Sequence, residues 1–152
     1  MADKSLIGCS LGVTRCEVEK GRLRFFAKAI GETDPVYTDE DAARNAGHRS
    51  LPVPPSFLMC LEAEGRDSDH IVQDIFGFDL GRILHAEQGF DYHGLAYAGD
   101  VLTFDTRVVD VYEKKGGALT FVVQQTRVTN QDGQHIADIR SSLIFWITLS
   151  QV

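Results

Sequence analysis

The sequence has few cysteines, no cluster of basic residues and no long apolar run. Its three cysteines, Cys9, Cys16 and Cys60, are an odd number without a Cys-x-x-C pair. We therefore expect reduced thiols instead of a disulfide framework, with Cys60 buried because it lies in an apolar stretch. No window approaches the roughly 18–20 apolar residues of a membrane span, and no signal-peptide run follows the first residues. These absences predict a cytoplasmic protein that does not enter a membrane.

Positive charge is scarce and scattered. The formal net charge is −7, and the longest basic run is the pair Lys114 and Lys115. Nucleic-acid binding is not expected, because neutralising phosphates requires clustered cations. No metal site is expected either, because no histidine has a ligand spacing with another histidine or a cysteine. His93, at the end of a predicted strand, is expected to be simply exposed.

The composition that remains is that of a folded globular protein. Of the 152 residues, 43% are hydrophobic and 24% are charged, which is ordinary for a protein with a packed core. This length suits one domain, and we take residues 1–152 as a single domain.

The first half of the chain has the apolar spacing of helices. We expect a helix over residues 17–30 that ends at Gly31, with Gly21 as an alternative start because glycine weakens the first turn. A short second helix is expected from about residue 38, with Thr38 as its N-cap. Residues 51–55 are too rich in proline for a helix interior. They lead into a third, most apolar helix, which Ser56 can cap. Residues 65–80 are predicted to be a loop.

The second half has the pattern of a β-meander. Strands are predicted at residues 83–92, 101–111, 118–129 and 134–147, with glycine-containing turns between the last three. A short strand is expected at residues 12–18. An antiparallel sheet wrapped around one apolar helix is the hot-dog arrangement of an α+β fold, and its edge strand needs a neighbour.

Three segments, residues 26–37, 54–57 and 84–100, resemble the MaoC-like hydratases and dehydratases. The likeness is to their N-terminal, FAS1-like dehydratase half and to the small subunit of two-subunit β-hydroxyacyl-ACP dehydratases. The resemblance implies a hot-dog domain that handles 3-hydroxyacyl or 2-enoyl groups carried on CoA or ACP, without a cofactor. It also implies that this half shapes the acyl tunnel and pairs with a canonical MaoC-like chain, although a homodimer is the simpler assembly.

Catalytic members of that family carry an Asp-x-Asn-Pro-(Leu/Ile)-His motif. Here Glu32, Asp34 and Tyr37 stand where the family has Asp, Asn and His, and Pro35 keeps the proline. A tyrosine, with a pKa near about 10, is a poor base at neutral pH. We therefore expect the chain alone to be weak or silent in catalysis. A plain alternative is a helix-to-helix turn that Asp34 caps and Pro35 stiffens.

Three further groups are candidates. His85 and Glu87 stand two apart on a predicted strand and are expected to share a face, as an acid–base dyad or as a structural pair. Pro55 and Ser56 precede the central helix, whose first amides could bind a thioester carbonyl. Two substrate-binding candidates that could reach CoA phosphates lie in a loop, namely His48 and Arg49.

Two other functions compete with the dehydratase hypothesis. The first is a non-catalytic subunit that binds acyl-CoA or acts as a scaffold, which the substitutions at Glu32 and Tyr37 favour. The second is a hot-dog thioesterase, in which Glu62 or Glu64 of the central helix would activate water. Release of free CoA would distinguish the thioesterase.

Overall fold

The computed structural model describes residues 3–146. Its main elements, in chain order, are β1 (Ser10–Glu17), α1 (Lys20–Ala29), a 3₁₀ turn (Pro35–Tyr37), α2 (Glu40–Asn45), α3 (Phe57–Glu64), a π-helical turn (His70–Ile75), β2 (Ile83–Tyr92), β3 (Val101–Lys114), β4 (Leu119–Thr129) and β5 (His135–Trp146). The predicted order of helices and long strands is confirmed. Residue 147 of the predicted last strand and the predicted domain end at residue 152 lie outside the described residues.

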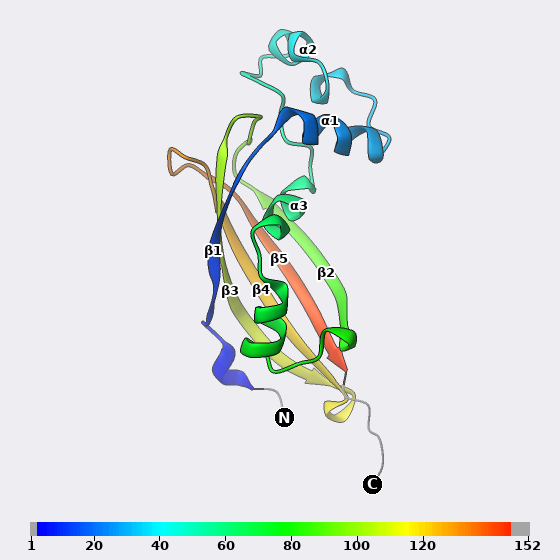
Figure 1. Cartoon of the computed structure of the whole chain (residues 1–152), viewed down its shortest axis with the longest axis vertical. Coiled ribbons are helices and arrows are strands. Elements are labelled where there is room, and N and C mark those ends of the chain that lie inside the picture. The colour runs from blue at the N-terminus through cyan, green and yellow to red at the C-terminus, as the bar shows by residue number, and fades with distance from the viewer. Residues whose placement is uncertain (1–2, 147–152) are drawn as a thin grey trace.

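The five strands form one antiparallel sheet in the order β1–β3–β4–β5–β2. Figure 1 shows this sheet curving around α3, with α1 and α2 beyond its upper end. β1 and β2 are therefore the two edge strands. The expected hot-dog arrangement, a sheet wrapped around a central helix, is confirmed. Within residues 3–146, no helix is both long enough and apolar enough to cross a lipid bilayer.

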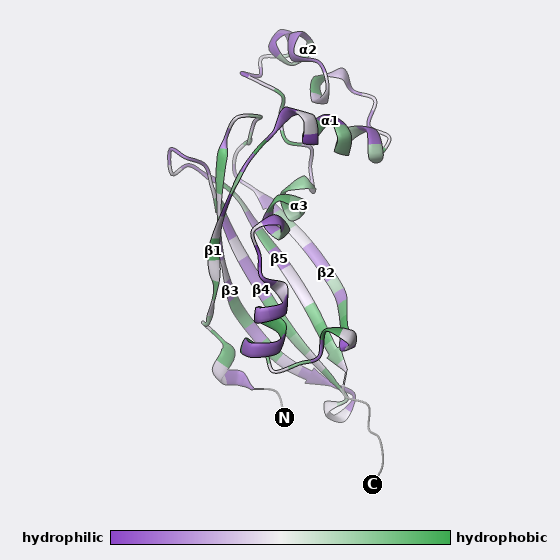
Figure 2. Cartoon of the chain, viewed as in Figure 1, coloured by the Kyte–Doolittle hydropathy of each residue, from purple (hydrophilic) through white to green (hydrophobic). Residues whose placement is uncertain are grey.

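The core lies between α3 and the concave face of the sheet. Phe57, Leu58 and Leu61 of α3 are at most 5% exposed. They pack in one cluster with residues of β3, β4 and β5, including Phe104 and Ile139. Figure 2 shows the contrast between the apolar α3 and the polar α2. Burial of this apolar surface is the main term that holds the helix on the sheet.

The end of α1 follows the prediction. Gly31 adopts a φ of +73°, its N–H donates to Lys28 O at 3.2 Å, and the N–H of Glu32 donates to Ala27 O at 2.9 Å. This bonding pattern is the Schellman motif, in which a glycine beyond the last turn accepts the left-handed conformation without strain. The helix begins at Lys20, three residues after the first predicted start and one residue before the alternative start at Gly21.

Three local predictions are wrong. The N-cap of α2 is Asp39, whose carboxylate accepts from the N–H of Ala42 at 2.8 Å, because Thr38 already ends the preceding 3₁₀ turn. Cys60 is exposed, since α3 directs its neighbours toward the sheet. Residues 65–80 are not only loop, because their π-helical turn buries Ile71 and Val72 over the lower part of the concave face.

Truncating a buried residue of α3 should lower the free energy of unfolding far more than truncating its exposed neighbour. Leu61 is 0% exposed, so Leu61→Ala should cost about 2–5 kcal/mol through lost burial and the cavity that remains. Cys60→Ala, one position away, should have little effect. Urea unfolding followed by circular dichroism measures both, and equal losses would contradict the described orientation of α3.

Candidate functional site

The loop between α1 and α2 brings together the three motif residues Glu32, Asp34 and Tyr37. Oε1 of Glu32 accepts from the backbone N–H groups of Thr33 and Asp34, both at 2.9 Å. Oδ1 of Asp34 accepts from the N–H of Val36 at 3.0 Å and so caps the 3₁₀ turn. Both carboxylates thus serve the local backbone, which is the turn-forming alternative expected for Asp34.

Tyr37 cannot supply the base that this loop lacks. Its partial burial raises the pKa of the phenol, and the carboxylates of Glu32 and Asp34 raise it further. The hydroxyl therefore stays protonated at neutral pH, and it can donate a hydrogen bond but not accept a proton. The geometry of the loop is suited to holding a turn and poorly suited to activating water.

The substrate-binding candidates His48 and Arg49 lie beside a buried aspartate, Asp100. Nη2 of Arg49 donates to both carboxylate oxygens of Asp100, at 2.5 and 2.7 Å, and its guanidinium lies 4.5 Å from the ring centroid of Tyr97. Nδ1 of His48 lies 3.2 Å from the hydroxyl oxygen of Tyr97. Both residues therefore have structural partners.

Asp100 anchors this cluster. Its side chain is 1% exposed, and burial by itself would raise the pKa of the carboxyl. Hydrogen bonds from Arg49, from Gln131 and from the backbone N–H of Tyr97 outweigh that effect and hold the pKa of Asp100 below its usual value. The sequence marks Asp100 only as part of a turn, and its charged partner lies 51 residues away.

The start of α3 is shaped by Pro55 and Ser56. Ser56 adopts a left-handed φ of +70°, which is strained for a residue with a side chain, and makes no side-chain capping bond. Its predicted cap is therefore wrong. The N–H of Ser56 donates to the hydroxyl oxygen of Tyr92 at 2.9 Å, and that of Phe57 donates to Pro54 O at 3.1 Å. Two amides proposed for a thioester carbonyl are thus already occupied.

His85 and Glu87 do not share a face of the sheet. A β-bulge in β2 lies between them, so that His85 pairs with Leu143 while Glu87 pairs with Ser142. Adjacent residues of β5 point to opposite faces, and their partners follow them. His85 therefore faces the side of α3, and Glu87 faces the other side. The expected dyad fails because strict alternation does not survive a bulge.

A cavity of about 330 Å³ opens between α3, the π-helical turn and the concave face of the sheet. Most of its wall is apolar, and a few polar side chains converge on it. Among the residues singled out in the sequence, His85 and the thioesterase candidate Glu62 line it. The main apolar lining residues are Met59, Ile71, Val72, Leu80, Ile83 and Leu143. Concave, largely apolar sites with a few placed polar groups are typical of small-molecule binding.

A buried ion pair forms the polar wall of this cavity. Oε1 of Glu62 accepts from Nη1 of Arg66 at 3.1 Å and from the hydroxyls of Thr126 and Thr106 at 2.6 and 3.3 Å. Nη2 of Arg66 donates to Oε1 of Gln124. Burial lowers the pKa of Arg66, and the Glu62 carboxylate opposes that effect. These hydrogen bonds offset the desolvation of the pair.

Two amide donors in the cavity have no acceptor. Nε2 of Gln88 and Nε2 of Gln124 are closed off from solvent and make no hydrogen bond within residues 3–146. Both side chains line the cavity. A buried donor left without a partner costs about 1–3 kcal/mol, so a side-chain rotation that brings either amide to a ligand oxygen in the cavity would be favourable. The available sequence signal is the alternation along β4, which places Gln124 on the same face as the buried Val122 and Val128.

Comparison with known proteins identifies relatives over most of the chain. The family model of the FAS1-like, dehydratase domain region matches residues 5–139. A UPF0336 protein of Saccharopolyspora erythraea is 31% identical over 144 residues, which cover 93% of this chain and 90% of that protein. A UPF0336 protein of Streptomyces griseus is 34% identical over 116 residues, or 75% of this chain and 76% of that protein.

Similar solved structures share the fold. The HadBC complex (3R-hydroxyacyl-ACP dehydratase) of Mycobacterium tuberculosis matches with a TM-score of 0.73 and 24% identity over 92% of this chain and 98% of that chain. The ChsH1–ChsH2 complex of the same organism matches with a TM-score of 0.73 and 20% identity, over 91% and 89% of the two chains. Likeness at this level of identity carries the architecture alone.

Removing the Asp100 charge should destabilise the fold in a pH-dependent way. Asp100→Asn should cost about 1.5–3 kcal/mol near neutral pH, the range for hydrogen bonds to charged groups. Because the folded pKa is lowered, this contribution is fully present above the unfolded pKa of about 3.9 and is lost as pH falls through the folded pKa. Urea unfolding of both proteins across this range should show their stabilities converging at acid pH.

The exposed pair Asp41 and Arg44 provides the control. Asp41→Asn should change the unfolding free energy little at any pH, because exposed ion pairs contribute little. A constant gap between Asp100→Asn and the unchanged protein down to the lowest pH would contradict the ionised state of Asp100.

Proposed function

This chain belongs to the FAS1-like dehydratase domain family, and we propose that it is the acyl-binding subunit of a dehydratase or hydratase acting on 3-hydroxyacyl or 2-enoyl thioesters. The observation that carries this proposal is the cavity beside α3, where an apolar wall meets two unpaired amide donors. Its volume of about 330 Å³ falls in the range of about 300–1,000 Å³ for small-molecule sites.

The cavity divides into parts that suit the two parts of an acyl thioester. Apolar side chains such as Leu143 and Ile71 suit the hydrocarbon tail, whose transfer from water is favourable. Gln88 and Gln124 can donate to an oxygen, such as a thioester carbonyl or a 3-hydroxyl group. The substrate is neutral where it meets these donors, so the net charge of −7 does not oppose its acyl part.

The proposed subunit needs a catalytic partner. Glu32 and Asp34 are bound to their own backbone, and Tyr37 stays protonated, so none of the three is placed to act as a general base. Two similar structures, HadBC and ChsH1–ChsH2, are described as complexes of two components. We extend that arrangement to this chain, with an intact motif on the partner.

The edge strand β2 is the surface proposed for the partner. Its backbone is unpaired on one side, and Leu84 and Tyr92 on it are 54% and 46% exposed. Next to α3, Phe25 of α1 is 75% exposed over an apolar groove. Unpaired strand edges are features of association surfaces, and exposed large apolar side chains beside them add area that a partner can bury. The catalytic partner proposed here is a canonical MaoC-like hot-dog chain. A second copy of this chain would cover the same edge as a homodimer but would not supply the intact motif.

A thioesterase role is less well supported. Glu62 faces the cavity, but its carboxylate is held by Arg66 and two threonine hydroxyls. Glu64 lies outside the cavity and pairs with Arg22. Neither carboxylate is free to activate a water molecule, which argues against hydrolysis of the thioester.

The purified chain should bind 2-enoyl-CoAs without hydrating them. Ser141→Phe places a ring in the cavity and should weaken binding at least about tenfold, a loss of about 1.4 kcal/mol. Arg140→Phe is the matched control, because it adds the same ring one position away, on the opposite face of β5. Isothermal titration calorimetry with a panel of chain lengths measures binding, and loss of enoyl absorbance measures hydration.

The same assay has outcomes that contradict the proposal. Robust hydration by the chain alone, abolished in Glu32→Ala and Tyr37→Phe, would make the loop a working active site. Release of free CoA would support the thioesterase instead. Absence of both binding and turnover for every chain length would remove the acyl-binding role.

Placing a charge on β2 should disrupt association. Leu84→Asp introduces a carboxylate on the exposed edge strand. We expect it to dissociate the complex with the canonical partner chain, and any homodimer of this chain, because a buried unpaired charge is costly. Val13→Asp is the control, since Val13 is 59% exposed on β1, the other edge strand. Light scattering after size-exclusion chromatography measures the mass. A monomer produced by Val13→Asp alone would place the interface on β1.

A further inference from the structure

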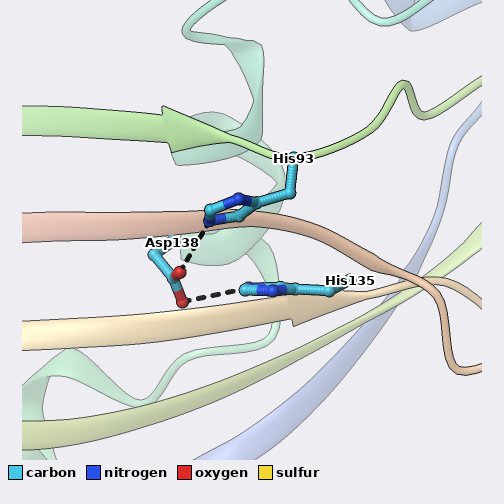
Figure 3. A group of neighbouring side chains, drawn as sticks. All are labelled: His93, His135 and Asp138. Atoms are coloured by element: carbon cyan, nitrogen blue, oxygen red, sulfur yellow. Dashed lines mark hydrogen bonds and ion pairs between the residues drawn. The ribbon is translucent and has the colours of Figure 1, made fainter.

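Away from the cavity, two histidines and one aspartate meet at the end of the sheet. His93 follows the last residue of β2, His135 begins β5, and Asp138 lies three residues further along β5. Nε2 of His93 lies 3.0 Å from Oδ2 of Asp138, and Nε2 of His135 lies 3.1 Å from Oδ1. The two imidazole rings stack with their centroids 4.3 Å apart. Figure 3 shows both rings directed at the one carboxylate.

The backbone holds these side chains on rigid elements. The N–H groups of His93 and Gly94 both donate to Ile136 O, at 2.8 and 3.1 Å, which fixes the end of β2 against β5. The turn before β5 is closed by Asn130, whose side-chain oxygen accepts from the N–H of Gln134 at 2.9 Å. Three donor groups are thus positioned by the sheet itself, a requirement for a preorganised binding site.

Two features of the cluster favour a bound cation: an imidazole nitrogen without a hydrogen bond and two aspartates opposite each other. Nε2 of His135 is closed off from solvent and makes no hydrogen bond within the described residues, although it lies 3.1 Å from Oδ1 of Asp138. In addition, Asp91 of β2 pairs directly opposite Asp138. Like charges at such positions are destabilising. A cation bound at Asp138 would give Nε2 of His135 a partner and would reduce the repulsion between Asp91 and Asp138.

No basic side chain takes that position. Arg127 of β4 is opposite Asp138 in the ladder and shares a shallow groove with it. However, among residues 3–146 the ion pairs of Asp138 are with His93 and His135 alone. Arg127 therefore makes no ion pair with Asp138, and the carboxylate contacts the two imidazoles instead.

We propose that His93, His135 and Asp138 bind a divalent transition-metal ion, with Zn²⁺ the best match. Zinc takes imidazole nitrogen and carboxylate oxygen at about 2.0–2.2 Å, so the ligand atoms of a tetrahedral site lie about 3.4 Å apart. The three donor atoms lie within 4.8 Å of one another, which small side-chain rotations would adjust. His93 is 45% exposed, so water can occupy the fourth position.

The two imidazole ligands also disfavour Mg²⁺ and Ca²⁺. Mg²⁺ and Ca²⁺ prefer six or more oxygen ligands, whereas two of these three donors are imidazole nitrogens. An ion bound here would join the end of β2 to β5 and would therefore raise the melting temperature as its concentration rises. The site lies on the face of the sheet opposite the cavity, so its occupancy is separable from acyl binding.

Titration of the chelator-treated full chain with Zn²⁺ and with Co²⁺ tests the proposal. We expect one Zn²⁺ per chain by calorimetry and a visible Co²⁺ absorption band from the mixed nitrogen and oxygen site. His135→Gln and Asp138→Asn should each weaken binding by at least about tenfold, the lower end of the effect of losing supporting groups at metal sites. Mg²⁺ and Ca²⁺ should not compete.

His70→Gln is the matched control. His70 pairs with Asp74 at 2.8 Å on the π-helical turn, and no third ligand group joins them among residues 3–146. This change should therefore leave Zn²⁺ affinity unaltered. Affinity should also fall at acid pH, because an imidazole must be neutral to bind a metal ion. Circular dichroism verifies that each variant is folded.

Three results would overturn the proposal. They are Zn²⁺ affinity unchanged in both His135→Gln and Asp138→Asn, loss of binding in His70→Gln, and absence of stoichiometric binding by the folded, unaltered chain. In the last case the cluster is an ion-paired surface group only.

Discussion

In α3, two consecutive residues are buried in different surroundings: Leu61 in the apolar core, and Glu62 against hydroxyl groups of the sheet. The two threonines that bind Glu62, Thr106 and Thr126, stand directly opposite each other in β3 and β4. Apolar packing alone would tolerate sliding or rotation of the helix. The buried carboxylate of Glu62, however, is stable only where it accepts hydrogen bonds from those hydroxyls. The polar contact therefore fixes the position of the helix, and the position of every group near it follows.

The length of α3 explains why a cavity exists at all. Its 8 residues span about 12 Å, whereas the 14 residues of β3 span about 46 Å. A helix this short covers only part of the concave face. The π-helical turn covers a further part through Ile71 and Val72, and the gap between the two helical pieces is the space that Arg66 and Gln124 border.

Features governed by near neighbours in the chain could be predicted from the sequence, as the glycine termination of α1 at Gly31 and the turns of the meander show. Features that depend on pairing between distant segments could not. The bulge that separates His85 from Glu87 is set by the register against β5, and Asp39 displaced Thr38 as a cap because of an adjacent turn. Residue spacing likewise gave no sign of the meeting of His93 with His135, which requires β2 to return beside β5.

The altered motif loop and the sheet differ in whether their polar side chains are already hydrogen-bonded. Glu32 and Asp34 retain carboxylates, but these accept hydrogen bonds from backbone N–H groups of the same loop. The carboxylates therefore hold the shape of the loop and are not placed as bases. Polar groups with unused bonding capacity are found elsewhere, facing the cavity at Gln124 and the opposite face at His135. Since alternation along β5 directs Ser141 inward and Asp138 outward, one strand supports both places without contact between them. The proposed binding groups of this chain therefore lie on the sheet, and the hydrogen bonds of Glu32 and Asp34 in the loop are to its own backbone.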